Sequence, residues 1–484
     1  MIDGKTIRNS LYNIITKLGS ILFPVVTFSY VSRIFLAEGM GRINFARSLV
    51  SFFALFANLG ISQYGVRECS KIKDNHEELS RSFFEIIVIN LLSAVIAYIL
   101  LFIFISSNSK AQFYQYEIIL FSLTIFLGII GADWLYTALE DYRYIALRSL
   151  VLQITALVMV LLFVHTKEDI YKYIIIQVIA SAGGNIFGLL HLKKYISLKR
   201  FTHFGIVRHV RSILKLFLVI FFIRIFADMD TVMLGYLSTE KEVGLYSASN
   251  KISSVLSGMI ASATAVFLPK IAYSFNKGDN EKVKSFLMTS MQGILMISIP
   301  ISIGSCIFAE RFILILSGIG FQEAALSSQI LSIRTFLSPV NAMLLVNYLI
   351  PKEEEKEAII ITAAAAIGNI FLNYLLIPST GAVGASVATV AAEAIELVFL
   401  YFFVRKQISF RDLFSTFPQC CICVIPVILI AYAASRIVNN NFLSIISGVV
   451  LSVPVYLFLL WRMHNPVVDM AIKMIRDRKN KVVQ

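Results

Sequence analysis

Three charged residues interrupt an apolar stretch of the sequence, FFIRIFADMDTVMLGYL at residues 221–237. Arg224 and Asp228 are four positions apart, so on a helix they share a face and can form an ion pair. Asp230 would lie about 200° around the helix from Asp228. A charge at the centre of a bilayer costs at least ~2.5 kcal/mol. Two interpretations stay open. In the first, the ion pair has a purely structural role. In the second, one of the acids, Asp228 or Asp230, takes up H⁺ or Na⁺, and Arg224 is then released in one conformational state only.

A second acidic pair, Glu393 and Glu396, lies in the apolar segment AAEAIELVF. The two carboxylates are three positions apart and would share a helix face. In a membrane such a pair must be protonated, ion-bound or paired with a cation from another helix. Together with Asp228 and Asp230, they are the predicted ion-coupling residues. The alternative for Glu393 and Glu396 is pairing with Arg334 or Lys251 for helix packing.

The composition explains why these charges are unusual. Of the 484 residues, 57% are hydrophobic and 15% are charged, whereas soluble domains carry about 25% charged residues. The mean hydropathy is +0.78. We therefore predict an all-α integral membrane protein. The net charge of +13 fits basic residues flanking cytoplasmic helix ends and does not indicate a nucleic acid partner. No cysteine or histidine pattern predicts a metal site.

Fourteen segments are long and apolar enough to span a bilayer, which takes about 20 residues. They are approximately residues 8–36, 43–66, 82–105, 117–139, 146–165, 170–192, 210–237, 243–268, 284–309, 325–350, 358–377, 384–404, 419–437 and 442–462. With this count, 29 basic residues fall on the side of the termini and 7 on the other. The positive-inside rule then places both termini in the cytoplasm.

An internal repeat organises these spans. An ungapped shift of 203 residues places Gly41 on Gly244 and Arg67 on Lys270, and it aligns span ends and loop charges. We therefore predict two pseudo-symmetric six-helix bundles plus two C-terminal helices. The expected domains are an N-terminal bundle (1–192), a cytoplasmic linker (193–209), a C-terminal bundle (210–404), a cytoplasmic loop (405–418), helices 13–14 (419–462) and a cytoplasmic tail (463–484).

Several motifs carry a family resemblance through their order and spacing. They are LGISQYGVRE (59–68), GADWLYTALEDYRYIALRS (131–149), VGLYSASNKI (243–252), FLPKIA (267–272) and IPSTGAVGASVATVAAE (377–393). Together they resemble the multidrug/oligosaccharidyl-lipid/polysaccharide (MOP) exporter superfamily, in its branch of O-antigen and polysaccharide-unit flippases. The resemblance covers nearly the whole chain.

The resemblance implies a multi-pass protein of the bacterial inner membrane that is a transporter and not an enzyme. Such a flippase moves an undecaprenyl-diphosphate-linked oligosaccharide from the cytoplasmic to the periplasmic leaflet by alternating access, around a central cavity. It needs no cofactor beyond a coupling ion, H⁺ or Na⁺, supplied by an ion gradient. The implied partners are the lipid-linked oligosaccharide, membrane lipids, and the polymerase and other proteins of polysaccharide assembly.

A diphosphate substrate gives a role to the basic residues within the spans. Arginine donates two parallel hydrogen bonds to phosphate, and lysine supplies a point charge. The predicted substrate-binding residues are Lys17, Arg47, Arg224, Lys251 and Arg334. The alternative is that these long side chains extend to the membrane interface. Asn341, Asn347, Asn369 and Asn373 would bind sugar hydroxyls or join helices.

Two other functions stay open from the sequence. One is an ion-coupled multidrug exporter of the same superfamily, for which the embedded cations are a poor match because its substrates are cationic. The other is a membrane sugar polymerase or ligase, which the short periplasmic loops disfavour. No GxxxxGK[ST] motif is present, so the chain carries no P-loop.

Overall fold

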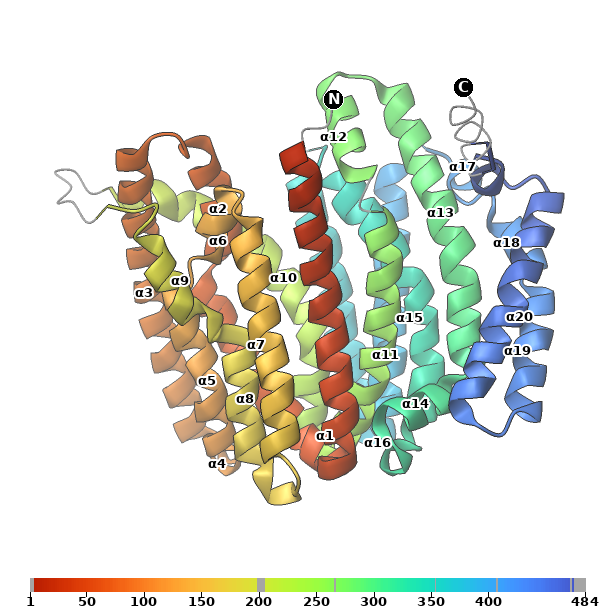
Figure 1. Cartoon of the computed structure of the whole chain (residues 1–484), viewed down its shortest axis with the longest axis horizontal. Helices are drawn as coiled ribbons and strands as arrows, with labels where there is room; N and C mark the ends of the chain where they lie inside the picture. Colours follow the sequence, from red (N-terminus) through yellow and green to blue (C-terminus); the bar gives the residue numbers. More distant parts are fainter. Residues whose placement is uncertain are drawn as a thin grey trace. The chain divides into compact units, whose positions relative to one another are not determined.

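The computed structural model describes residues 4–197, 205–264, 267–352, 354–405, 408–470 and 472–473 (Figure 1). Side chains are described from residue 22 onward and at Gly19, apart from residues 219, 263, 264, 276 and 410 in those ranges. Every regular element in this part of the chain is a helix. The chain divides into two compact units, Met1–Gly244 and Leu245–Gln484.

The first unit consists of long apolar helices joined by short turns. The helices are α1 (Gly4–Asn58), α2 (Ile61–Lys71), α3 (His76–Ser107), α4 (Ser109–Phe113), α5 (Gln115–Ile130), α6 (Asp133–Ala138), α7 (Tyr142–Phe163), the 3₁₀ turn η1 (Lys167–Asp169), α8 (Ile170–Ala182), α9 (Gly184–Leu192) and α10 (Val207–Leu237). Local sequence sets their ends. The Asn75 side chain, for example, accepts a hydrogen bond from the Glu78 backbone N–H and so caps α3.

The second unit is built in the same way. Its helices are α11 (Glu240–Thr264, which begins in the first unit), α12 (Leu268–Asn276), α13 (Asn280–Ile307), α14 (Ala309–Ser317), the 3₁₀ turn η3 (Ile319–Phe321), α15 (Ala324–Leu344), the π-helical turn η4 (Leu345–Leu349), α16 (Glu355–Val404), α17 (Phe410–Leu413), α18 (Phe417–Cys423), α19 (Ile425–Ile437) and α20 (Asn441–Arg462). Apolar side chains of α13, α15, α16, α18 and α20 form its main core.

Two helices are far longer than one membrane crossing needs. α1 has 55 residues and α16 has 50, whereas about 20 residues span a bilayer. Each contains one residue with a positive φ that breaks the helix, Leu36 (φ 57°) in α1 and Gly381 (φ 55°) in α16. The breaks fall between spans that the sequence predicted as separate. A single residue therefore separates the helices where the sequence analysis placed loops of several residues.

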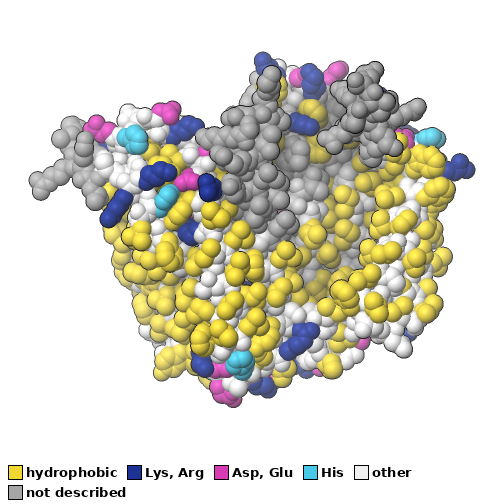
Figure 2. Space-filling model, in the orientation of Figure 1, with side chains coloured by type: hydrophobic (Ala, Val, Ile, Leu, Met, Phe, Trp, Pro, Cys, Tyr) yellow, Lys and Arg dark blue, Asp and Glu magenta, His cyan; other side chains and the backbone are white. Residues whose placement is uncertain are grey.

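Eight helices in the described ranges are long and apolar enough to cross a membrane, or nine if one bent pair counts as a span. This number is below the predicted fourteen partly because α1 and α16 each merge two predicted spans. Figure 2 shows hydrophobic side chains over the middle of the visible face, with charged side chains mostly towards the top and bottom of the view. Such an apolar exterior suits lipid, and the chain is an all-helical, multi-pass membrane protein.

Two glycines allow a close backbone contact at the start of α11. A Cβ added to Gly41 of α1 would lie 1.8 Å from the carbonyl oxygen of Glu240, and one added to Gly244 would lie 1.9 Å from that of Ala37. Any larger residue would therefore force the two backbones apart. These are the two glycines that the 203-residue shift aligns.

Candidate functional site

A buried polar cluster joins three helices of the second unit. The Arg334 guanidinium on α15 donates from Nε to Glu393 Oε1 on α16 at 3.3 Å. Its Nη1 donates to the side-chain oxygen of Asn250 on α11 and lies 3.4 Å from the Ser254 hydroxyl. The Arg334 side chain is 18% exposed and that of Glu393 is 3% exposed. The cation predicted to bind phosphate is therefore held by an acid and by neutral acceptors.

Asn341 extends this cluster to the second acid. It lies two helical turns beyond Arg334 on the same face of α15. Its Nδ2 donates to Glu393 Oε2 at 2.8 Å and to Glu396 Oε2 at 3.2 Å, and also to the Glu393 backbone carbonyl at 2.9 Å. Asn341 thus bridges both carboxylates and joins α15 to α16, in agreement with its helix-joining alternative.

Two acids and one guanidinium take part in the contacts described for this cluster. Glu393, Glu396 and Asn341 are all at least 95% buried, and Arg334 forms an ion pair with Glu393. A buried carboxylate that lacks a compensating charge is costly. A proton or a small cation would neutralise it. This is the chemistry that ion coupling requires.

The charges of the opening motif lie in the first unit, and two of them, Arg224 and Asp228, are more exposed. Arg224 Nη1 is 3.9 Å from Asp228 Oδ2, and the two side chains are 57% and 35% exposed. The Ser51 hydroxyl of α1 donates to the same Asp228 oxygen at 3.1 Å. Asp230 is buried at 2% exposure. The pair at i and i+4 forms as predicted, and Asp228 also links α10 to α1.

The structure describes the side chains of two of the three remaining predicted cations, Arg47 and Lys251. Arg47 is exposed and donates to Asn44 Oδ1 at 2.8 Å within α1. Lys251 is half-buried on α11, next in sequence to Asn250. The side chain of Lys17 lies outside the described residues. Asn369 and Asn373, both fully buried on α16, hydrogen-bond to each other at 3.0 Å, and Asn347 is buried in η4.

A second buried network, in the first unit, was not predicted. Glu85 of α3 is 0% exposed and accepts from the Gly205 backbone N–H at 2.6 Å and from Arg81 Nε at 3.0 Å. Arg208 and His209, at the start of α10, donate to its other oxygen at 2.9 and 2.8 Å. The i, i+4 spacing of Arg81 and Glu85 was the available signal. Arg81 and Arg208 were instead counted as cytoplasmic charges.

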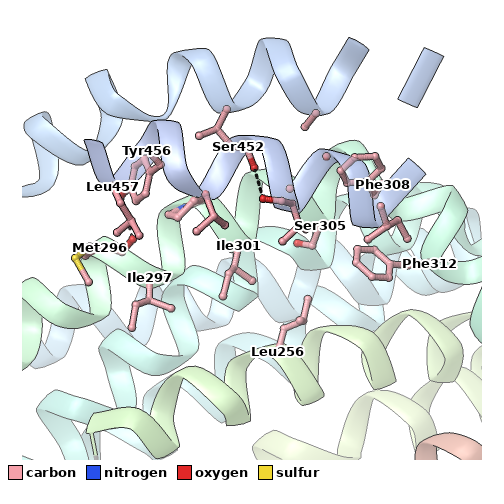
Figure 3. A pocket seen from close by; sticks show the side chains of 18 residues that line it. Leu256, Met296, Ile297, Ile301, Ser305, Phe308, Phe312, Ser452, Tyr456 and Leu457 are labelled. Carbon is pink, nitrogen blue, oxygen red and sulfur yellow. Dashed lines mark hydrogen bonds between the residues drawn. The ribbon is translucent and has the colours of Figure 1, made fainter. Parts of the chain in front are cut away.

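An apolar groove lies on the second unit between α13, α14, α19 and α20 (Figure 3). Its volume is about 350 Å³, within the ~300–1,000 Å³ usual for ligand pockets. The side chains of Ile301, Phe308, Phe312 and Leu457 point into it from facing helices. None of its lining residues is charged. The groove can hold a hydrocarbon chain.

Comparison with known proteins identifies the family to which this chain belongs. A sequence profile of the polysaccharide biosynthesis protein family matches residues 6–275, more than half of the chain. The chain belongs to this family. It is 21% identical over 408 residues to a putative O-antigen transporter of Escherichia coli strain K12, an alignment that covers 83% of this chain and 97% of the relative.

Solved structures with the same fold align with most of this chain. A lipid II flippase, MurJ, in an inward closed conformation matches with a TM-score of 0.75 at 18% identity, covering 95% of this chain and 99% of that one. An inward-facing multidrug resistance MATE transporter of the MOP superfamily matches with a TM-score of 0.60 at 14% identity, covering 80% and 94%. The predicted resemblance to this superfamily and the all-helical fold are confirmed. The fourteen spans and their arrangement in two six-helix bundles stay a prediction. The relatives named here are described as transporters or flippases, in line with the expectation that the chain is not an enzyme.

Proposed function

We propose that this protein translocates an undecaprenyl-diphosphate-linked oligosaccharide, an O-antigen or related repeat unit, from the cytoplasmic to the periplasmic leaflet. The observation that carries the proposal is the family match over more than half of the chain, with a putative O-antigen transporter among its relatives. The proposed setting is the bacterial inner membrane, with fourteen spans arranged as two six-helix bundles plus two helices and with both termini in the cytoplasm.

The substrate has three parts, and each needs a different environment. The diphosphate is anionic and suits the predicted cations Lys17, Arg47, Arg224, Lys251 and Arg334. The polyprenyl tail is apolar and suits the uncharged groove between α13, α14, α19 and α20. The glycan is polar and must cross about 30 Å of hydrocarbon. A protein that supplies all three environments removes the desolvation cost that prevents spontaneous crossing.

Ion coupling is proposed to act through the buried acids. In the contacts described for this cluster, two carboxylates, Glu393 and Glu396, accompany one guanidinium, that of Arg334. Uptake of H⁺ or Na⁺ there would weaken the attraction between Glu393 and Arg334. Arg334 would then donate its hydrogen bonds to a phosphate oxygen of the substrate instead of to Glu393. Asp228 with Arg224 offers a second, more exposed pair of the same kind, and Asp230 is the further candidate on α10.

Complementation of a flippase-null bacterial strain tests the proposal. The wild-type chain should restore surface glycan when the matching glycosyltransferases are present. Neutral variants Arg224→Gln, Asp228→Asn, Lys251→Gln and Arg334→Gln should lower the amount of surface glycan when compared with wild type at equal membrane levels of protein. Normal surface glycan from all four variants would remove the proposed roles of these residues. Failure of the wild-type chain in hosts with several different glycans would remove the proposed function.

A further inference from the structure

A small polar cavity lies within the first unit, away from the charged residues considered so far. Its volume is about 120 Å³, several times the ~10–15 Å³ that one water needs. Helices α1, α2, α3, α5 and α6 contribute to it. Its polar lining residues are Asn58, Ser62, Asn90, Thr124 and Trp134. The lining also includes Asn58 and Gly128, which are exposed, so the cavity reaches the surface beside them.

Two buried residues in the lining carry polar side-chain groups. Trp134 is 5% exposed, and its indole Nε1 has no hydrogen-bond partner among the described residues. Asn90 is 7% exposed, and the bond described for it uses its backbone carbonyl, which accepts from the Ser93 hydroxyl. A buried donor or acceptor left unsatisfied costs about 1–3 kcal/mol. The Trp134 N–H carries this cost, and the Asn90 amide offers a further hydrogen-bonding group in the lining.

Packing holds the indole of Trp134 in one position. The ring stacks on Phe83, with ring centroids 5.5 Å apart and an angle of 28° between the planes. It also lies against the backbone of Gly65, where an added Cβ would be 2.3 Å from the ring. The N–H of Trp134 is thus pre-positioned, which lowers the entropy cost of binding a ligand there.

The lining selects the chemistry of an occupant. It contains no Lys, Arg, Asp or Glu, so nothing there compensates a charged ligand. The unpartnered N–H of Trp134 disfavours a bare cation. Amide and hydroxyl groups alternate with apolar surface from Ala54, Ala57 and Ile125. This combination fits a neutral ring that has hydroxyls along its edge and C–H groups on its face, as a pyranose does.

We propose that this cavity binds one sugar residue of the glycan that the protein translocates, with Trp134 Nε1 and the Asn90 amide as its hydrogen-bonding partners. The inference rests on the proposed function for the origin of the sugar. It adds a neutral glycan subsite to the charged groups that would bind the diphosphate. Ordered water is the alternative occupant of a polar cavity of this size.

Fluorescence provides a direct test because the chain has two tryptophans. The variant Trp461→Phe leaves Trp134 as the single fluorescent indole, in the wall of the cavity. The full-length variant is reconstituted in lipid nanodiscs and titrated with methyl glycosides of glucose, galactose, rhamnose and N-acetylglucosamine. We expect at least one of these probes to shift the Trp134 emission saturably.

Matched glycine variants assign the response to the cavity. A Cβ added at Gly128, in the lining, meets nothing within 4 Å, and the same holds at Gly293 of α13, outside the lining. In the Trp461→Phe background, Gly128→Val adds bulk to the lining at a position where the Cβ meets no clash, and it should weaken binding at least tenfold. Asn90→Ala should also weaken it, whereas Gly293→Val should leave it unchanged.

The outcomes separate this inference from the proposed function. No saturable response to any glycoside, or a response that Gly128→Val and Asn90→Ala leave intact, overturns the sugar site and leaves water as the occupant. Surface-glycan complementation by the wild-type chain would then still support the flippase. Conversely, saturable binding that these variants abolish supports the site even where the wild-type chain fails in complementation.

Discussion

Arg334 and Glu393 are 59 positions apart in the sequence, yet the guanidinium Nε lies 3.3 Å from a carboxylate oxygen inside the second unit. Neither side chain has more than 18% of its surface exposed. A buried pair of this kind stabilises a membrane protein only while both partners remain, because each charge alone is poorly solvated. The pair is therefore a stability determinant and, in the proposed mechanism, the element that an ion or a phosphate would rearrange.

Replacing one partner of this pair should destabilise the protein more than replacing both. Arg334→Gln or Glu393→Gln alone should cost about 3–5 kcal/mol, because a buried charge is left unpaired. The double variant should recover part of this loss. Thermal or denaturant unfolding of the four proteins in detergent gives the coupling energy. Strictly additive losses would contradict the pairing.

The Glu85 network should contribute to stability in the first unit. Glu85→Gln keeps the shape of the side chain but removes the charge that Arg81, Arg208 and His209 share. We expect a loss on the order of 1–3 kcal/mol, typical of a buried group that loses charged hydrogen bonds. Glu77→Gln, exposed in the first turn of the same helix, is the control. Equal unfolding free energies for the two variants would disprove the role of Glu85.

Asp141, which precedes α7, should give a pH-dependent contribution to stability. Burial acts to raise its pKa, but hydrogen bonds from His191 and Tyr195 outweigh burial and hold the pKa of Asp141 below its usual value. A lowered folded-state pKa stabilises the fold above the unfolded pKa, about 3.9 for Asp. This stabilisation is lost as the pH falls through the folded pKa.

Asp141→Asn should therefore lower the unfolding temperature at pH 7, and the gap from wild type should close at pH values below about 4. Unfolding measured in detergent at a series of pH values tests this. Glu140→Gln, which breaks the exposed pair between Glu140 and Lys73, should have little effect at any pH. A gap for Asp141→Asn that stays constant into acid would contradict the assignment.

The apolar groove should be sensitive to filling. Gly304 lines it, and a Cβ added there meets nothing within 4 Å. Gly304→Val should therefore occupy the groove without destabilising the fold, and it should slow translocation of polyprenyl-linked substrate several-fold. Gly293→Val is again the matched control. Equal transport rates for the two variants, at equal protein levels, would show that the groove does not hold the tail.

The sequence predicted the membrane class, the helical fold and the superfamily, because hydropathy and ordered motifs depend on local composition. It also identified two of the ion pairs: Arg224 with Asp228 from their spacing, and Arg334 with Glu393 as one alternative. Spacing finds partners only within one helix, so the bridge from Asn341 to both acids needed the packing of α15 on α16.

Other features depend on contacts that no local pattern encodes. Glu85 lies near the start of the predicted span 82–105, and its burial depends on the chain near Gly205, whose backbone N–H donates to it. Likewise, Leu36 has a positive φ that non-glycine residues rarely adopt. The polar cavity at Trp134 forms where five helices meet, so its lining residues are scattered from residue 54 to residue 134.

Transport in a defined membrane tests the central claim most directly. Purified protein is reconstituted in liposomes with an undecaprenyl-diphosphate-linked oligosaccharide, and a lectin that cannot cross the membrane reports the leaflet of the glycan. With an imposed H⁺ or Na⁺ gradient, the account predicts translocation that exceeds protein-free liposomes and is lost in Arg334→Gln and Glu396→Gln. Glycan that stays in its original leaflet at the protein-free rate, for wild-type protein under either gradient, would contradict it.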